Sequence, residues 1–210
     1  MIQEIYLDLD DVLCMCVPHV FNELAGTDNE MSYDWWQRRW LYSIQQGVAE
    51  VRQLLGKHQL EGDFWSHVSR DVWASIPKTP FCDWLVDAAC RAVGIENVFF
   101  LTRPTRYGDC YGGKADWIIE QLGEPHVEQL MLTKHKAKLA RSDRLLIDDR
   151  PSNIDEFLAA GGKTIMCPRP WNALDGEDPV EYIRHKWVHY FADPMPEYEP
   201  EVEHAVEATE

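Results

Sequence analysis

The sequence predicts an α/β fold, in which a Rossmann-like parallel sheet carries helices on both faces and a small helical cap is inserted after the first strand. Short apolar segments of strand length recur along the chain, at residues 2–7, 98–101, 127–132, 145–147 and 163–166. Segments with helical periodicity separate them, an alternation typical of parallel sheets covered on both faces. A long helical stretch follows the first strand alone, which is where a cap or lid belongs.

Three predicted helices lie between the later strands. Trp84, Leu85, Ala88, Ala89 and Ala92 share one face of the first, which ends at Gly94. The second covers residues 114–122 and ends at Gly123. The third covers residues 154–160, before Gly161 and Gly162. Glycine after the last turn is a common helix terminator.

We expect three regions. Residues 1–13 and 77–190 form the Rossmann-like core and residues 14–76 the helical cap, with a proline-containing break at residues 76–80 between them. Residues 191–210 form an acidic tail. From Ala192 to Glu210 there are seven acidic residues, three prolines and no Lys or Arg, so we expect this tail to be solvated and mobile.

The composition excludes several classes of partner. A net charge of −16 disfavours binding to a nucleic acid polymer or docking on an anionic membrane.

The six cysteines lack zinc-type spacing and are expected to be reduced thiols. The first motif begins at Asp8, too early for a signal peptide, and no apolar run approaches transmembrane length. We therefore expect a cytoplasmic protein. The sequence leaves the oligomeric state open, and a homodimer is one of the alternatives.

Pairs of carboxylates follow two of the predicted strands: Asp8 and Asp10 follow the first, and Asp148 and Asp149 follow the fourth. Carboxyl ends of parallel strands meet at one edge of a sheet, where ligands bind. Gathering carboxylates there is costly, because they repel one another and lose solvation. A bound cation removes the cost, and Mg²⁺ prefers such ligands together with phosphate oxygens. The pattern therefore points to phosphoryl chemistry.

Each part of this pattern can be given a role. Asp8 would attack phosphorus to form an aspartyl-phosphate, and Asp10 would protonate the leaving oxygen and later deprotonate the attacking water. If the strand stays extended, these two side chains point the same way. Thr102, at the end of the second strand, would hold a phosphoryl oxygen, a lysine from residues 134–138 would neutralise charge, and Asp148 or Asp149 would complete the Mg²⁺ site.

Each part also has a structural alternative. The first aspartates could form a turn, Thr102 could cap a helix, the lysines could be a basic surface stretch, and the Asp-Asp pair could cap the next helix. The combined pattern disfavours all four structural alternatives, because the four parts occur in order and each follows a predicted strand.

In this order the motifs resemble those of the haloacid dehalogenase-like phosphatases. More narrowly, three stretches resemble the 5′(3′)-deoxyribonucleotidase family: Leu101-Thr102-Arg103-Pro104 with Cys110, Lys114 and Trp117; Leu132-Thr133-Lys134-His135-Lys136; and Leu145-Leu146-Ile147-Asp148-Asp149-Arg150-Pro151. The likeness covers most of residues 4–172 and is loose in the cap. It implies a haloacid dehalogenase-type core, a small helical cap, Mg²⁺ dependence and hydrolysis of nucleoside monophosphates.

The resemblance also implies roles for residues. Asp8 is the nucleophile, and Asp10 is the acid/base and gives Mg²⁺ a backbone carbonyl. Thr102 binds phosphate, and Lys136 matches the family's lysine better than Lys134 or Lys138. Lys114 matches a second lysine that reaches the phosphate. Asp148 is a direct Mg²⁺ ligand, and Asp149 is either a ligand or a neighbour of one.

The chain departs from the family pattern at three positions. Asp11 replaces the usual glycine, and Arg103 replaces a frequent serine, where it is either an extra phosphate clamp or a surface residue. Cys16 stands where an aromatic side chain usually contacts the base. Trp35 and Trp36 resemble the cap aromatics of the substrate pocket by local pattern, with the cap core as the alternative.

These observations predict a hydrolase, a Mg²⁺-dependent phosphatase that converts (deoxy)nucleoside monophosphates to nucleoside and phosphate. The alternative is the same chemistry on a sugar phosphate or another small phosphoester. A receiver-type domain that is phosphorylated on aspartate fits less well, because its phosphorylated aspartate lies in mid-chain and it has no long insertion. An inactive nucleotide-binding relative also fits less well, because the predicted catalytic residues are all present.

Overall fold

Five parallel strands form a single sheet in a computed structural model, which describes residues 1–27, 33, 40 and 43–200. Their order is β3-β2-β1-β4-β5, so the first strand is central. The strands are β1 (Glu4–Leu7), β2 (Val98–Thr102), β3 (Leu130–Leu132), β4 (Arg144–Asp148) and β5 (Lys163–Met166). The predicted parallel sheet is confirmed.

One strand is shorter than predicted. β3 begins at Leu130, because residues 124–129 form a 3₁₀ helix, η4 (Glu124–Gln129). Gly123 turns the chain with a φ of 103°, and Pro125 lies in the first turn of η4, where its missing N–H costs nothing. The apolar residues of 127–129 therefore belong to a helical turn.

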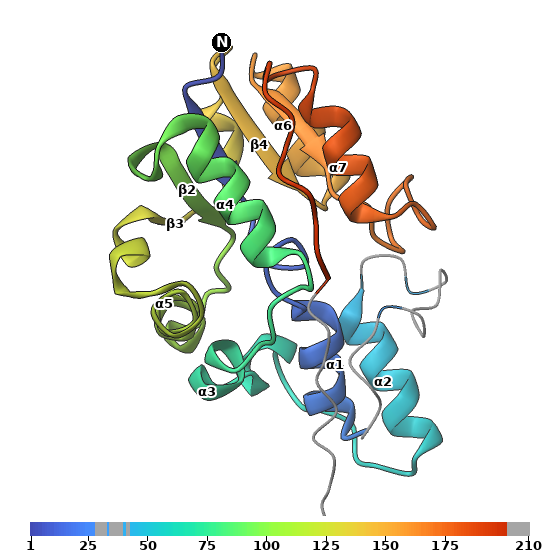
Figure 1. Cartoon of the computed structure of the whole chain (residues 1–210). Helices are drawn as coiled ribbons and strands as arrows, with labels where there is room; N and C mark the ends of the chain where they lie inside the picture. The colour runs from blue at the N-terminus through green and yellow to red at the C-terminus, as the bar shows by residue number, and fades with distance from the viewer. Residues whose placement is uncertain (28–32, 34–39, 41–42, 201–210) are drawn as a thin grey trace, which may run out of the picture.

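Helices cover both faces of the sheet (Figure 1). On one face α6 (Pro151–Ala159) packs Phe157 against Tyr6, Leu101 and Leu146. The larger cluster on the other face includes Ile5, Leu7 and Ile147, and it is covered by α4 (Cys82–Val93) and α7 (Pro179–Trp187). Two short 3₁₀ helices, η3 (Ile95–Asn97) and η5 (Lys136–Leu139), lie next to strands.

Helix α5 (Gly108–Leu122) begins six residues before the predicted start at Lys114. Two adjacent glycines, Gly112 and Gly113, would ordinarily disfavour a helix at this point. Here they allow α5 to pack closely on α3 (Arg70–Ala74). A Cβ at Gly113 would lie 2.3 Å from the Cβ of Trp73. The glycines therefore serve helix contact and not helix termination.

Between β1 and α4 the chain forms α1 (Cys16–Ala25), α2 (Ile44–Leu54), η2 (Phe64–His67) and α3. Figure 1 shows these helices grouped below the sheet, beyond the strand ends that carry the predicted site. The boundaries of a cap at residues 14–76 stay a prediction. Trp35 and Trp36 lie outside the described residues.

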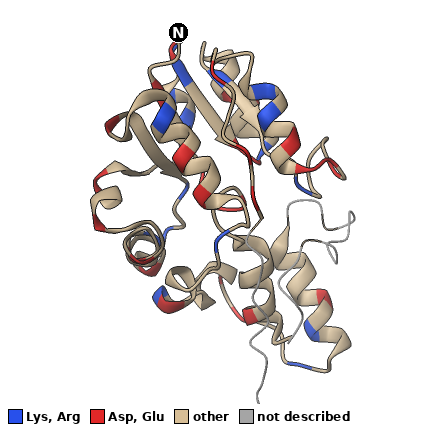
Figure 2. Cartoon of the chain, viewed as in Figure 1, with Lys and Arg blue, Asp and Glu red and all other residues tan. Residues whose placement is uncertain are grey.

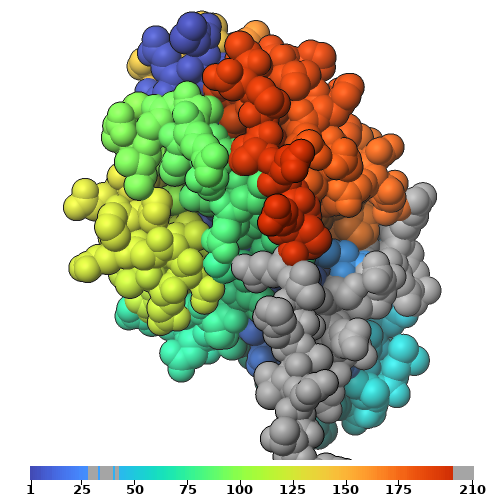
Figure 3. All heavy atoms as spheres, viewed as in Figure 1, coloured from blue at the N-terminus to red at the C-terminus, as the bar shows by residue number. Residues whose placement is uncertain are grey.

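The predicted mobile tail is wrong for its first part. Met195 is buried, Trp84 Nε1 donates to the backbone oxygen of Pro196 at 2.8 Å, and the Tyr198 hydroxyl donates to Pro80 O at 3.2 Å. Figure 3 shows this segment, in red, lying along the surface beside α4. Apolar Met195 and Tyr198 outweigh the acidic composition here; residues 201–210 lie outside the described part.

Both α4 and α7 carry charged residues of both signs (Figure 2), with an acidic residue in the first turn and basic residues in the last turn. In the part of the chain that the structure describes, no helix has the length and apolar character needed to cross a membrane.

Candidate active site

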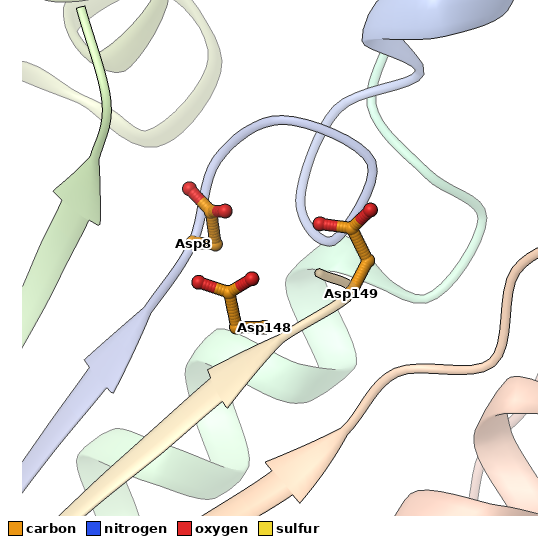
Figure 4. Close-up of side chains that lie close together, drawn as sticks. All are labelled: Asp8, Asp148 and Asp149. Atoms are coloured by element: carbon orange, nitrogen blue, oxygen red, sulfur yellow. The ribbon is translucent and has the colours of Figure 1, made fainter. Parts of the chain in front are cut away.

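Three carboxylates meet at the carboxyl ends of the two central strands (Figure 4). Leu7 pairs with Ile147 in the sheet register, which brings Asp8, directly after β1, next to Asp148 at the end of β4. Oxygen atoms of Asp8, Asp148 and Asp149 all lie within 4.8 Å of one another, and the three residues are buried. This donor set could hold a metal ion.

Lys136 joins two of these carboxylates. Its Nζ lies 2.8 Å from Asp8 Oδ2 and 2.7 Å from Asp148 Oδ2, and the side chain is buried. Lys134 and Lys138 are exposed. The structure therefore brings to the cluster the lysine that the family resemblance favours.

A second buried lysine joins Asp10 to Thr102. Lys114 Nζ lies 2.6 Å from both carboxylate oxygens of Asp10 and donates to Thr102 Oγ1 at 2.7 Å. β1 ends at Leu7, and residues after it form a tight turn in which Cys14 N donates to Leu9 O. The strand therefore does not stay extended through Asp10, so the condition for Asp8 and Asp10 to point the same way is not met, and the Asp10 carboxylate pairs with Lys114 outside the three-carboxylate group.

Hydrogen bonds hold in place the carboxylates of Asp148, the last residue of β4, and of Asp149, which follows it. Asp148 accepts from the backbone N of Arg150 at 2.9 Å and from Asn153 Nδ2 at 2.9 and 3.0 Å. Asp149 Oδ2 accepts from Trp171 Nε1 at 2.6 Å. These donors set the orientation of both carboxylates before any ligand binds.

Asp11 has a structural role in the turn. It is the one non-glycine residue in the described part with a positive φ, 60°, a conformation that aspartate tolerates better than most residues. Its Oδ1 accepts from Val17 N at 2.9 Å and from the Tyr33 hydroxyl at 3.0 Å, and Arg169 Nε donates to its backbone oxygen at 2.6 Å. These contacts hold the aspartate in the positive-φ conformation of the turn.

Burial dominates the electrostatics of the site. Loss of solvation raises the pKa of Asp8 and of Asp149 well above the ordinary value, and neighbouring aspartates add to the rise. Burial also raises the pKa of Asp11 to about 7. Burial alone would lower the pKa of Lys136, but Asp148 and Asp8 more than offset it, so this lysine stays charged.

A pocket of about 900 Å³ opens over these groups. Asp8, Asp10, Asp149, Arg103 and Cys16 are among its lining residues. Among the described residues, Trp65, Trp73, Tyr107, Tyr111 and Trp171 contribute aromatic side chains to the lining. Burial raises the pKa of the Cys16 thiol well above its usual range, so Cys16 offers a small neutral surface.

The architecture and the strand-end site can be compared with known proteins. No family model and no curated protein matches the chain. Among solved structures, a HAD (haloacid dehalogenase) family hydrolase from Deinococcus radiodurans R1, with bound phosphate and sodium, has 13% sequence identity and a TM-score of 0.52, covering 90% of this chain and 96% of its own. The chain has the haloacid dehalogenase-type fold.

Two further similar structures have lower TM-scores. A HAD-superfamily hydrolase from Geobacter sulfurreducens PCA has 14% identity and a TM-score of 0.45, over 82% of this chain and 90% of its own. A HAD family enzyme from Bacteroides thetaiotaomicron, in complex with magnesium and inorganic phosphate, has 17% identity and a TM-score of 0.40, over 88% and 100%. The narrower nucleotidase resemblance stays a prediction.

The haloacid dehalogenase-type fold also brings to the site residues that the sequence reasoning missed. Arg169, Trp171 and Asn172 follow β5, and the Asn172 side chain donates to Asp149 O at 2.9 Å. The rule that sites lie beyond the carboxyl ends of strands applies to β5 as well and would have found them. Asn153 lies in the first turn of α6 and offered no comparable signal.

Proposed function

We propose that this protein is a hydrolase, a Mg²⁺-dependent phosphatase that converts (deoxy)nucleoside monophosphates to nucleoside and phosphate through an aspartyl-phosphate. The observation that carries the proposal is the position of Asp8, which lines the pocket, contacts Lys136 and belongs to the three-carboxylate group. A carboxylate can attack a phosphate ester only where positive charge screens their repulsion, and this arrangement supplies it.

The residues present fit a divalent cation. Five buried or half-buried aspartates (Asp8, Asp10, Asp11, Asp148, Asp149) share three buried cations (Lys114, Lys136, Arg169), which leaves a formal charge of −2. Carboxylate oxygens are the ligands that Mg²⁺ prefers. We assign it to Asp8, Asp148 and Asp149 with the backbone carbonyl of Asp10. When bound, Mg²⁺ would neutralise charge on the phosphoryl oxygens.

The protein's own groups carry the two steps. A carboxylate oxygen of Asp8 forms a bond to phosphorus while the ester P–O bond breaks, and Asp10, which must be protonated for this step, gives its proton to the leaving oxygen. Asp10 then takes a proton from water as that water attacks phosphorus, which frees Asp8 and releases phosphate. Lys136, Lys114 and Thr102 hold the phosphoryl oxygens throughout.

The aromatic lining supports a nucleoside as the leaving group. Trp65, Tyr107 and Trp171 line the pocket and are only half-buried, and Tyr111 is exposed there. Aromatic side chains of this kind suit a planar base. The pocket volume is within the range of small-molecule sites. Cys16 favours the alternative, a sugar phosphate or another small phosphoester, because it removes the aromatic group that usually contacts the base.

Phosphate release from ribo- and deoxyribonucleoside 5′- and 3′-monophosphates and from sugar phosphates, with Mg²⁺ and with EDTA, tests the proposal. We expect Mg²⁺-dependent release that favours deoxynucleotides. Release from sugar phosphates alone would keep the mechanism and reject the nucleotide. Absence of release from every ester would reject the phosphatase.

A further inference from the structure

We propose that the pocket holds a second anionic group of the substrate, carried by the leaving group and bound between Arg103 and Lys134. This inference rests on the proposed phosphatase chemistry but not on the nucleotide assignment. It makes the preferred substrate a phosphomonoester that also carries a second phosphate or a carboxylate.

The sheet places the two cations on neighbouring segments. Thr102 pairs with Leu132 in the register of β2 and β3, and Thr133 N donates to Thr102 O at 2.9 Å just beyond the strands. Arg103 follows Thr102 directly, and Lys134 follows Thr133. Both residues line the pocket and both are exposed.

Neither cation has an ionic partner in the part of the chain that the structure describes. Arg103 and Lys134 have no ion-pair partner among the residues described, whereas Arg106, in the same loop as Arg103, lies 2.7 Å from Asp63. The chain has 36 acidic residues and 20 Lys and Arg, so partners are not scarce. Two neighbouring, unpaired cations repel each other, and a bound anion relieves that repulsion.

The transferred phosphoryl group has its own cations. Lys136 and Lys114 are buried beside Asp8 and Asp10, whereas Arg103 and Lys134 are exposed on the pocket wall. A pocket of about 900 Å³ also leaves room well beyond one phosphate. A guanidinium binds phosphate or carboxylate through two parallel hydrogen bonds, and an ammonium adds a point charge. The pair therefore suits an anion at the far end of the substrate.

Matched substrates test this. We would measure kcat/KM for a nucleoside 3′,5′-bisphosphate against its 5′-monophosphate, and for fructose 1,6-bisphosphate against fructose 6-phosphate. In at least one pair, we expect kcat/KM to be about tenfold or more higher for the substrate with two anionic groups. This is the effect of a charge-assisted hydrogen bond. Arg103→Ala or Lys134→Ala should remove that preference, mainly through KM. For the substrate with one phosphate, either variant should change kcat/KM by less than about twofold.

Two variants and one binding measurement make the result decisive. Arg103→Lys keeps the charge and should retain part of the preference. Lys138→Ala removes an exposed lysine that does not line the pocket and should change neither substrate. Equal losses for both members of a pair would overturn the proposal, because they would place Arg103 and Lys134 on the transferred phosphoryl group. If no ester is hydrolysed, calorimetric binding of the same pairs still decides: equal affinity for both members rejects the second anion site.

Discussion

Arg169 donates a hydrogen bond from Nε to the backbone oxygen of Asp11 at 2.6 Å, across 158 residues of sequence. The guanidinium is buried, and the rings of Tyr33 and Phe81 lie 4.6 and 5.4 Å from its central carbon. The contact joins the segment after β5 to the turn that carries Asp8 and Asp10. Arg169 is therefore a positioning residue for the candidate site.

Replacing Arg169 should destabilise the protein. Arg169→Met keeps the length of the side chain but leaves Asp11 O without this donor and removes a cation near Asp11 and Asp149. We expect the free energy of unfolding to fall by about 3 kcal/mol, the scale for removing one partner of a buried charged group. Urea unfolding measures it. Arg184→Met, which breaks an exposed pair with Glu181, should cost less than about 1 kcal/mol, and similar losses for both would contradict the role of Arg169.

Asp8→Asn should abolish turnover without unfolding the chain. The amide cannot form the aspartyl-phosphate, so we expect kcat to fall at least about 1,000-fold, the scale seen when a nucleophile is removed. Steady-state kinetics gives the loss, and circular dichroism checks the fold. Turnover close to that of the unchanged protein would remove Asp8 as the nucleophile.

Mg²⁺ should stabilise the folded chain through the three carboxylates. A ligand present at about 100 times its dissociation constant adds about 2.7 kcal/mol to the free energy of unfolding. We therefore expect Tm to rise by several degrees with Mg²⁺ relative to EDTA. Asp149→Asn should reduce the rise, whereas Asp155→Asn, at an exposed position of α6, should not. An undiminished rise in Asp149→Asn would exclude that residue as a ligand.

Gly113 should be intolerant of a side chain. A Cβ there would lie 2.3 Å from Trp73 Cβ and 2.6 Å from the backbone oxygen of Arg70, so Gly113→Ala must separate α3 from α5. We expect a loss of about 2 kcal/mol in the free energy of unfolding, typical of overpacking. Gly108→Ala is the control in the same helix, because its Cβ would meet nothing within 4 Å. Equal stability of the two variants in urea would show that the helices separate freely.

His19 should make stability depend on pH. Burial lowers its pKa below the ordinary value of 6.5, against opposing effects of Glu23 and the Val72 backbone. Below about pH 6.5 the unfolded chain takes up a proton that the folded protein binds less readily, so this contribution to stability falls as the pH falls. His19→Gln should lose less stability than the unchanged protein between about pH 7.5 and pH 5.5, measured by urea unfolding. Parallel losses in both proteins would contradict this.

Local sequence patterns were sufficient for most of the sheet. Apolar runs flanked by glycine or polar residues predicted all five strands, because a strand buried on both faces must be apolar along its length. They failed at residues 127–129, where apolar side chains lie in η4, and at the start of α5, where Gly113 looks like a break. At α5 the deciding contact comes from α3, a segment that short-range periodicity does not include, whereas at residues 127–129 the turn at Gly123 and Pro125 sets the helical conformation.

The sequence by itself determined the parallel sheet and placed Asp8, Thr102 and Asp148 at its carboxyl edge, because strand order along the chain and apolar periodicity are local properties. Only the tertiary structure decided how charge is shared there. Lys136 pairs with Asp8 and Asp148, and Lys114 pairs with Asp10 and Thr102. Which cation meets which carboxylate depends on loop paths between distant strands, and on burial, which no single segment of sequence specifies.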